Sequence, residues 1–175
     1  MKKTFLVLFA VLSFTACKTS SKNEVEFTRE RTEIQHQNVR FPEPVGFIND
    51  FDDIFTPDQE KDLEDRLREY EQQTSNHIAV VTVNSIEPYN EIQWYATDLA
   101  NYWRVGKKEK DNGLLIVLNN NEREIWISTG LGTEKIITDE FLKNTIDSTI
   151  IPEFRNGDYH NGIAKGVEEI IVKWK

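Results

Sequence analysis

The stretch that decides the fold covers residues 114–128 and reads Leu-Leu-Ile-Val-Leu, Asn-Asn-Asn-Glu, then Arg-Glu-Ile-Trp-Ile-Ser. Its first part, residues 114–118, is a short and continuous apolar run, which is typical of a strand buried on both faces. The asparagine-rich link over residues 119–122 is a turn signal, and residues 123–128 form a second strand-like run. The pattern therefore predicts a β-hairpin within the folded part of the chain.

Two helices and one more buried strand are predicted before this hairpin. Residues 56–59 (Thr-Pro-Asp-Gln) combine a capping threonine, a first-turn proline and a capping-box glutamine. A helix should therefore begin there and end near Thr74. Residues 77–83 form a short β-branched run, which predicts a buried strand. Apolar side chains recur with helical spacing over residues 91–105, which predicts a second helix.

Two further helices are predicted after the hairpin. One should begin at Thr138 and Asp139 and stop before Pro152, and the last should begin at Gly157 and Asp158. Helices alternate with strands in the first part, and the hairpin follows. The expected fold class is therefore α/β, with a small mixed sheet sandwiched between helices.

The first sixteen residues have the features of a secretory signal peptide. Met1-Lys2-Lys3 is a positive start, and residues 4–16 form an uncharged, mostly apolar run that is shorter than the roughly 20 residues needed to cross a bilayer. Residues 14–17 (Phe-Thr-Ala-Cys) resemble a bacterial lipobox, which implies that Cys17 is the lipidated first residue of the mature chain. The alternative is a plain secretory signal with Cys17 inside or beyond the cut. Either way we expect export to the cell envelope, and lipidation implies a membrane-anchored lipoprotein facing the periplasm or in the outer membrane.

The segment after the signal is polar and lacks a sustained apolar period, so residues 17–44 are predicted to be a flexible tether and residues 45–175 a single domain. Cys17 is the only cysteine, so no intramolecular disulfide is possible. Removing residues 1–16 takes away two lysines and changes the formal net charge from −9 to −11. Such an acidic chain is a poor match for nucleic acid, and it suits cation binding better.

Several common chemistries are excluded or disfavoured by the residues present. The domain has no cysteine, and the histidines His36, His77 and His160 are isolated, so thiol catalysis is excluded and a clustered zinc site is not indicated. Residues 130–132 (Gly-Leu-Gly) lack the further residues of a nucleotide-binding loop. Residues 50–54 (Asp-Phe-Asp-Asp-Ile) imitate the start of an aspartyl phosphatase motif, but the fifth position is wrong and a helix cap follows at once.

Oxygen-bearing side chains remain, and they gather in predicted loops and helix starts. Hard cations such as Ca²⁺ take about six to eight oxygen ligands, which loops from distant parts of a chain can supply. The candidates are Asp50, Asp52, Asp53, Asp111, Asn112, Glu134, Asp139 and Asp158. Each has an ordinary structural explanation as well, because acids favour helix N-termini and Asp-Asn-Gly is a turn sequence. Spacing alone leaves both explanations open.

Five sequence blocks, in order, resemble the TPM domain, a family of bacterial envelope and thylakoid-lumen proteins. The blocks are residues 46–50 (Gly-Phe-Ile-Asn-Asp) with Thr56-Pro57, residues 110–113 (Lys-Asp-Asn-Gly), Arg123 with residues 125–127, residues 130–134 with 137–139, and residues 151–159 with Gly162. The resemblance covers about residues 46–174. Leu131 and Thr133 depart from it, since the family often has Tyr and Leu at these positions.

The resemblance implies a three-layer α/β/α sandwich and a divalent-metal site where loops converge at one end of the sheet. The cation would be Ca²⁺, as in some relatives, and the implied ligands are Asp50, Asp111, Asn112, Glu134 and Asp139. The first functional hypothesis is therefore a metal-binding envelope protein with an accessory or interaction role toward an unknown protein partner. The alternative is a metal-assisted acid phosphatase acting on phosphate monoesters, because a thylakoid relative has been described as one. The third hypothesis is an adaptor with a tryptophan surface, although tryptophans at such spacings are more often core.

Overall fold

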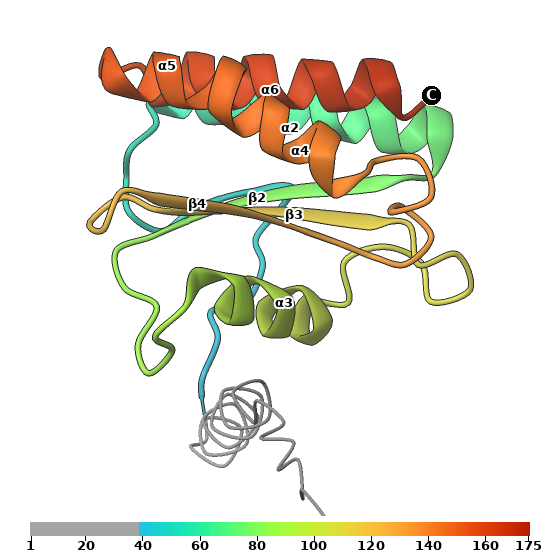
Figure 1. Ribbon diagram of the computed structural model, residues 1–175, viewed down its shortest axis with the longest axis horizontal. Helices are drawn as coiled ribbons and strands as arrows, with labels where there is room; N and C mark the ends of the chain where they lie inside the picture. Colours follow the sequence, from blue (N-terminus) through green and yellow to red (C-terminus); the bar gives the residue numbers. More distant parts are fainter. Residues whose placement is uncertain (1–38) are drawn as a thin grey trace, which may run out of the picture. The chain divides into compact units, whose positions relative to one another are not determined.

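A mixed four-stranded sheet forms the middle layer of the protein, for which a computed structural model describes residues 39–175 (Figure 1). Its strands are β1 (Ile48–Asp50), β2 (His77–Val83), β3 (Gly113–Asn119) and β4 (Glu124–Thr129). They lie in the order β1-β2-β3-β4; the first three are parallel, and β4 runs antiparallel to β3. The predicted hairpin over 114–128 is thereby confirmed.

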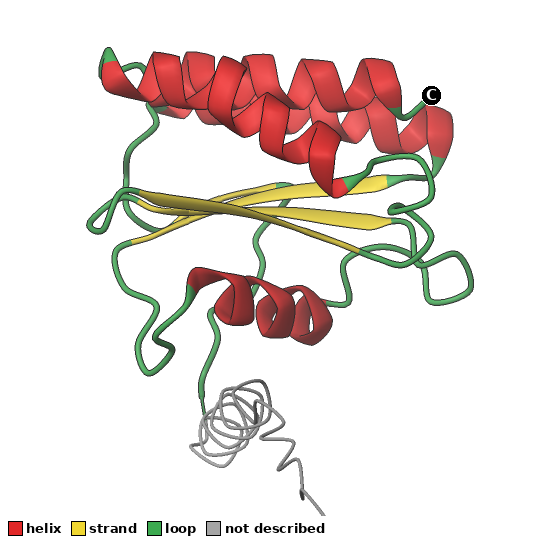
Figure 2. Ribbon diagram, in the orientation of Figure 1, coloured by secondary structure: helices red, strands yellow, loops and turns green. Residues whose placement is uncertain are grey.

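Helices cover both faces of the sheet, as Figure 2 shows. On one face lie α2 (Pro57–Thr74), α4 (Asp139–Thr145), α5 (Ile151–Arg155) and α6 (Tyr159–Lys173), and on the other lies α3 (Ile92–Trp103). The expected α/β class is confirmed, and the arrangement is consistent with the predicted sandwich. No helix in residues 39–175 has the length and apolar character needed to span a membrane.

The main core lies between the sheet and the larger helical layer. Ile78 and Val80 of β2 and Leu114 and Ile116 of β3 join the buried side chains of that layer. Every residue of β3 is buried, as expected for a central strand whose apolar run is continuous. The helix α2 begins as predicted, because the Thr56 hydroxyl accepts from the Gln59 N–H and the Gln59 side chain accepts from the Thr56 N–H.

Two expectations about the elements were wrong or incomplete. The strand β1 was not predicted, because it has only three residues and its sequence carries no alternation. The helix at Asp139 was expected to stop before Pro152, but it continues through a π-helical turn, η1 (Ile146–Ile150), into α5. Pro152 lies at the second residue of α5, where the chain passes from the π-helical turn into the α-helix.

The packed chain begins before residue 45. Phe41 lies among the rings of Tyr89, Tyr95 and Tyr102, with centroid distances of 5.5–6.1 Å. The Pro42 carbonyl accepts a 2.7 Å hydrogen bond from the Trp103 indole. Residues 41–43, placed in the tether by the sequence, therefore contact α3 and the segment before it. The predictions for residues 1–38, including the signal peptide, Cys17 and most of the tether, lie outside the described residues.

Candidate functional site

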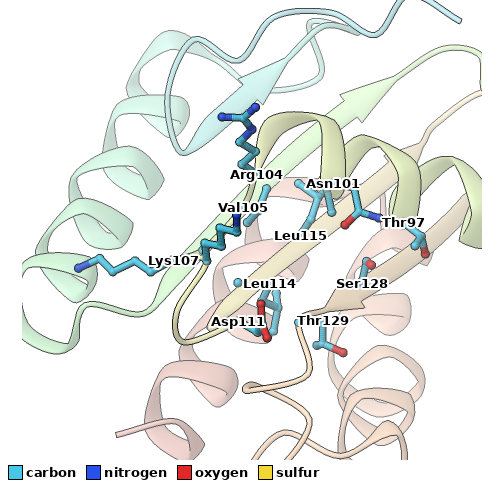
Figure 3. A pocket seen from close by; sticks show the side chains of 15 residues that line it. Thr97, Asn101, Arg104, Val105, Lys107, Asp111, Leu114, Leu115, Ser128 and Thr129 are labelled. Carbon is cyan, nitrogen blue, oxygen red and sulfur yellow. The ribbon is translucent and has the colours of Figure 1, made fainter.

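A pocket of about 590 Å³ lies beside α3, where β3 begins and β4 ends. We call it the α3–β4 pocket (Figure 3). Its lining comes from α3, the loop after α3, the first residues of β3 and the last of β4: Thr97, Ala100, Asn101, Arg104–Lys108, Asp111, Gly113–Leu115 and Ser128–Gly130. Apart from Val105, Leu114 and Leu115, these are small, hydroxylated, amide or charged residues, so the pocket is suited to a polar ligand.

The loop that brings Asp111 to the pocket is held by the neighbouring Asn112. The Asn112 side-chain oxygen accepts from the Lys107 N–H at 2.9 Å, and its amide group donates to the Ser75 carbonyl at 2.7 Å and to the Asn76 side chain at 3.2 Å. Asn112 is only 6% exposed. Its amide is thus already bonded on both sides, and its main role is to fasten the loop to the start of β2.

The Gly-Leu-Gly sequence after β4 is explained by close backbone contact with the same loop. A Cβ atom at Gly130 would lie 2.2 Å from the Asp111 carbonyl, and one at Gly132 would lie 1.9 Å from the Lys110 carbonyl. The Asp111 carbonyl accepts from the backbone N–H groups of Gly132 and Thr133. Only glycine allows this approach, which fixes the ends of β3 and β4 against each other.

Asp111 presents an unoccupied carboxylate to the pocket. Its backbone is held as described, at a φ of 46°, while its side chain has no hydrogen bond or ion pair within residues 39–175. Figure 3 shows this side chain beside Leu114, on the side of the pocket where Thr129 lies, whereas Arg104 and Lys107 extend away from it. The carboxylate of Asp111 is consequently available to a ligand.

Glu134 is connected to the same region through Thr129. The Thr129 hydroxyl and the Glu134 carboxylate lie 3.4 Å apart, and Thr129 lines the pocket. Both Asp111 and Glu134 are exposed. Two of the five residues implied as ligands, with Asn112 behind them, are therefore gathered around the amino end of β3.

The structure does not bring the other two, Asp50 and Asp139, to the α3–β4 pocket. Asp50 aligns with Thr82, which aligns with Leu118, so Asp50 is at the carboxyl end of the parallel strands. The step from Leu118 back to Gly113 alone spans roughly 16 Å. Asp139 borders a different depression, between β4 and α4. Asp50 therefore cannot share an ion with Asp111, and Asp139 is not part of the lining of the α3–β4 pocket.

At its own end of the sheet, Asp50 is fully engaged. One carboxylate oxygen accepts from the Phe55 N–H at 2.7 Å, and the other accepts from the Thr82 hydroxyl. Nearby, Asp52 accepts from Asn120 at 3.0 Å. These bonds tie the loop after β1 to β2 and to the turn after β3, which is a structural role.

The described residues contain no group of three or more His, Cys, Asp or Glu side chains placed to hold a metal. A cation in the α3–β4 pocket would therefore have at most two carboxylates, Asp111 and Glu134, with hydroxyl, amide, carbonyl and water oxygens completing its shell. Thr97, Asn101, Ser128 and Thr129 were not among the predicted site residues. Sequence patterns gave no signal for them, because isolated polar residues on a helix or at a strand end are common.

These features define the class of protein: a small α/β/α sandwich domain with a polar pocket at the amino end of its third strand, where Asp111 lies together with the basic residues Arg104, Lys107 and Lys108. A family model described as TPM domain, and labelled TPM_phosphatase, matches residues 48–173. The chain belongs to the TPM domain family.

Solved structures of bacterial proteins agree with this assignment. The N-terminal domain of a protein from P.gingivalis, solved by NMR, is similar with a TM-score of 0.66 and 32% identity over 72% of this chain and 80% of that one. BA42 from Bizionia argentinensis has a TM-score of 0.61 at 22% identity, over 70% and 83% of the two chains. The N-terminal domain of cg2496 from Corynebacterium glutamicum has a TM-score of 0.58 at 13% identity, over 78% of this chain and 86% of that one. The matches to BA42 and cg2496 show the fold alone. No curated protein matches the chain.

Proposed function

We propose that this TPM domain binds a divalent cation, Ca²⁺ above all, in the α3–β4 pocket. The observation that carries the proposal is the Asp111 carboxylate, which lies at the pocket with no partner among the described residues. Glu134 is the second carboxylate, and Ser128, Thr129 and Asn101 supply neutral oxygens. All are hard oxygen donors, the kind that Ca²⁺ prefers.

The donor set also predicts how tightly the ion is held. A site with two carboxylates on exposed loops belongs with the weak extracellular calcium modules, for which dissociation constants are on the order of 10⁻⁴–10⁻³ M. Such an affinity suits an exported domain, since free Ca²⁺ is scarce in the cytosol and abundant outside the cell. We therefore propose an accessory or interaction role in the cell envelope in which the ion orders the loops at this end of the sheet.

Thermal unfolding with added Ca²⁺ tests the proposal. For a dissociation constant of about 1 mM, 10 mM Ca²⁺ should stabilise the domain by about 1.4 kcal/mol and raise Tm by about 5 °C. The Asp111→Asn variant should lose most of this rise, because it keeps the shape and the positive-φ backbone but removes the charge. Glu134→Gln should lose part of it.

Two controls separate a site from general charge screening. Glu109→Gln removes an exposed carboxylate from the same loop outside the pocket and should keep the full response. Asp50→Ala should keep it too, at a lower starting Tm, because Asp50 lies at the other end of the sheet. A wild-type domain with no response to any divalent ion, or equal losses in all variants, would refute the proposal.

A metal-assisted phosphatase is the second candidate, and one observation favours it. Arg104, Lys107 and Lys108 also line the pocket of this acidic domain, and they could attract a phosphate group toward a bound cation. The label of the matching family points to the same activity. Steady hydrolysis of p-nitrophenyl phosphate with Ca²⁺ or Mg²⁺, lost in Asp111→Asn and in Arg104→Ala, would support it. Turnover that survives Asp111→Asn would show a contaminating enzyme.

We also propose that the domain is exported and held at the membrane by a lipid on Cys17. The support is the signal-like pattern of residues 1–16 and the position of the only cysteine. In a bacterial host the wild type should fractionate with membranes. The Cys17→Ser variant should appear unlipidated, and mass spectrometry of the N-terminal peptide would distinguish the two.

A further inference from the structure

The two outer edges of the sheet are protected to different degrees. At the β1 edge the Glu64 carboxylate accepts from the Ile48 N–H at 2.9 Å and from the N–H of Phe47, just before the strand, at 2.7 Å, so the first donors along the edge of this three-residue strand are already paired. At the other edge, β4 is six residues long, and no strand in residues 39–175 pairs with its outer side. Native edges are usually blocked by charged residues, proline, a bulge or a very short strand, whereas β4 has a single charged residue, Glu124, at its first position.

The backbone of β4 presents alternate residues to the outside. The Gly130 N–H donates to the Gly113 carbonyl, and Leu114 aligns with Thr129. In an antiparallel pair the bonded residues alternate, so Glu124, Trp126 and Ser128 bond to β3. It follows that Ile125, Ile127 and Thr129 direct their N–H and C=O groups away from the sheet, where an added strand could bond to them.

An apolar depression runs along this edge. We call it the β4 groove. It has a volume of about 480 Å³ and is lined by Ile125–Ile127 of β4 and by Asp139, Leu142, Lys143, Ile146 and Asp147. The second group has the spacing of one face of a helix, formed by α4 and the start of η1. Trp126, which had been expected in the core, is 39% exposed here. The groove therefore offers a surface for the apolar side chains of an extended peptide.

The charges along the groove are unbalanced. Lys143 forms an ion pair with Asp147, so these two charges offset each other. Asp139 has no cationic partner among the described residues, and it is exposed at the first turn of α4. A basic side chain at the matching position of an incoming strand would be drawn to Asp139.

We propose that β4 is a docking edge for an extended segment of a partner protein, which adds to the sheet as a fifth strand. Its side chains that face the groove are apolar at alternate positions, and one lysine or arginine lies opposite Asp139. The juxtaposition that supports this is an open strand edge, an apolar groove beside it and one unbalanced carboxylate along the groove.

A peptide titration on the ¹⁵N-labelled domain, residues 39–175, tests the proposal directly, since these residues contain the whole sandwich. The probe is acetylated Val-Thr-Val-Thr-Lys-Thr, whose alternate residues carry the required apolar and basic groups. Amide shifts should gather at residues 124–129 and 139–147. Two further peptides are N-methylated, one at its odd residues and the other at its even residues. Only one of them should lose binding, because alternate N–H groups of the added strand face β4.

Matched variants probe the charge and the edge separately. Asp139→Lys should weaken binding of the lysine peptide by about fivefold, the size expected for one exposed ion pair, and should favour the same peptide with glutamate in place of lysine. Ile125→Pro removes one outward N–H and should weaken both peptides by about tenfold. Circular dichroism verifies the fold of each variant.

Three results would overturn the proposal. Shifts outside β4 and α4 would place the peptide elsewhere, and equal binding of both N-methylated peptides would exclude strand addition. A dimer in sedimentation of the wild type that dissociates in Ile125→Pro would show that the edge belongs to a second copy of this chain. None of these measurements involves a cation, so they are independent of the calcium proposal.

Discussion

The acidic side chains at the two ends of the central sheet differ in the hydrogen bonds that they make. At the carboxyl end, both oxygens of Asp50 accept hydrogen bonds, from Phe55 and from Thr82, and the carboxylate fastens a loop. At the amino end of β3, Asp111 is held only by its backbone, and its carboxylate is unoccupied. The neighbouring Asn112 does the fastening instead. The comparison teaches that residue type marks a possible ligand, while the hydrogen bonds already made decide whether it is available.

Among the variants that test this difference, Asp50→Ala should have the largest effect on the free energy of unfolding. It removes two hydrogen bonds to a charged acceptor and leaves the fully buried Thr82 hydroxyl without its acceptor. We expect a loss of about 3 kcal/mol in the free energy of unfolding. Urea unfolding followed by circular dichroism measures it.

The matched variant at the other end is Asp111→Asn, which should change the free energy of unfolding by less than about 0.5 kcal/mol in the absence of Ca²⁺. Asparagine tolerates the positive φ of this position as well as aspartate does. If Asp111→Asn were as destabilising as Asp50→Ala, the two carboxylates would both be structural, and the contrast between the two ends would fail.

A second comparison uses adjacent residues. Asn112→Ala should cost about 2 kcal/mol, because it leaves the Lys107 N–H and the Ser75 carbonyl without their side-chain partner in a partly buried region. It should also lower the apparent affinity for Ca²⁺ without removing a ligand, since the loop that positions Asp111 is loosened. Binding that is unchanged in Asn112→Ala would show that the loop keeps its shape without this anchor.

The strands and helices with strong local signals were predictable from sequence. The capping box at residues 56–59, the β-branched run at 77–83 and the hairpin at 114–128 each carry a pattern that local physics enforces. The strand β1 was missed because it has only three residues without alternation, and the partner of its Ile48 N–H is Glu64, which is remote in sequence.

The placement of the helices had no local signal either. Strands β1, β2 and β3 are neighbours in order, yet α2 and α3 cover opposite faces (Figure 1). The two crossovers therefore have opposite hands, and the general preference for right-handed crossovers would not have predicted that. The lack of local signals affected the prediction of the site more than the prediction of the fold. Whether Asp50 meets Asp111 depends on strand register and direction, which no spacing of residues reveals.

The smallest effect concerns Glu60, at the carboxyl end. Partial burial raises the pKa of Glu60 above 4.5, and the charges of Asp50 and Asp53 raise it further. A carboxyl group with a raised pKa in the folded state favours folding while it is protonated, and that contribution is lost as the pH rises above 4.5. At neutral pH the charged Glu60 is therefore slightly destabilising. Glu60→Gln should stabilise the domain by a few tenths of a kcal/mol, reduced by solvent screening.

The gain in Glu60→Gln should shrink as the pH falls toward 4, where the wild-type side chain also becomes neutral, and it should shrink in high salt. Unfolding of both proteins in urea at several pH values between 4 and 8 measures this difference. Glu109→Gln, at the amino end, is the control, because its carboxylate is exposed and lies outside the crowded acids. A pH-dependent gain of equal size in both variants would mean that the effect follows the overall negative charge of the chain. A gain confined to Glu60→Gln would mean that the acids at the carboxyl end repel one another. The hydrogen bonds of Asp50 would then offset this repulsion.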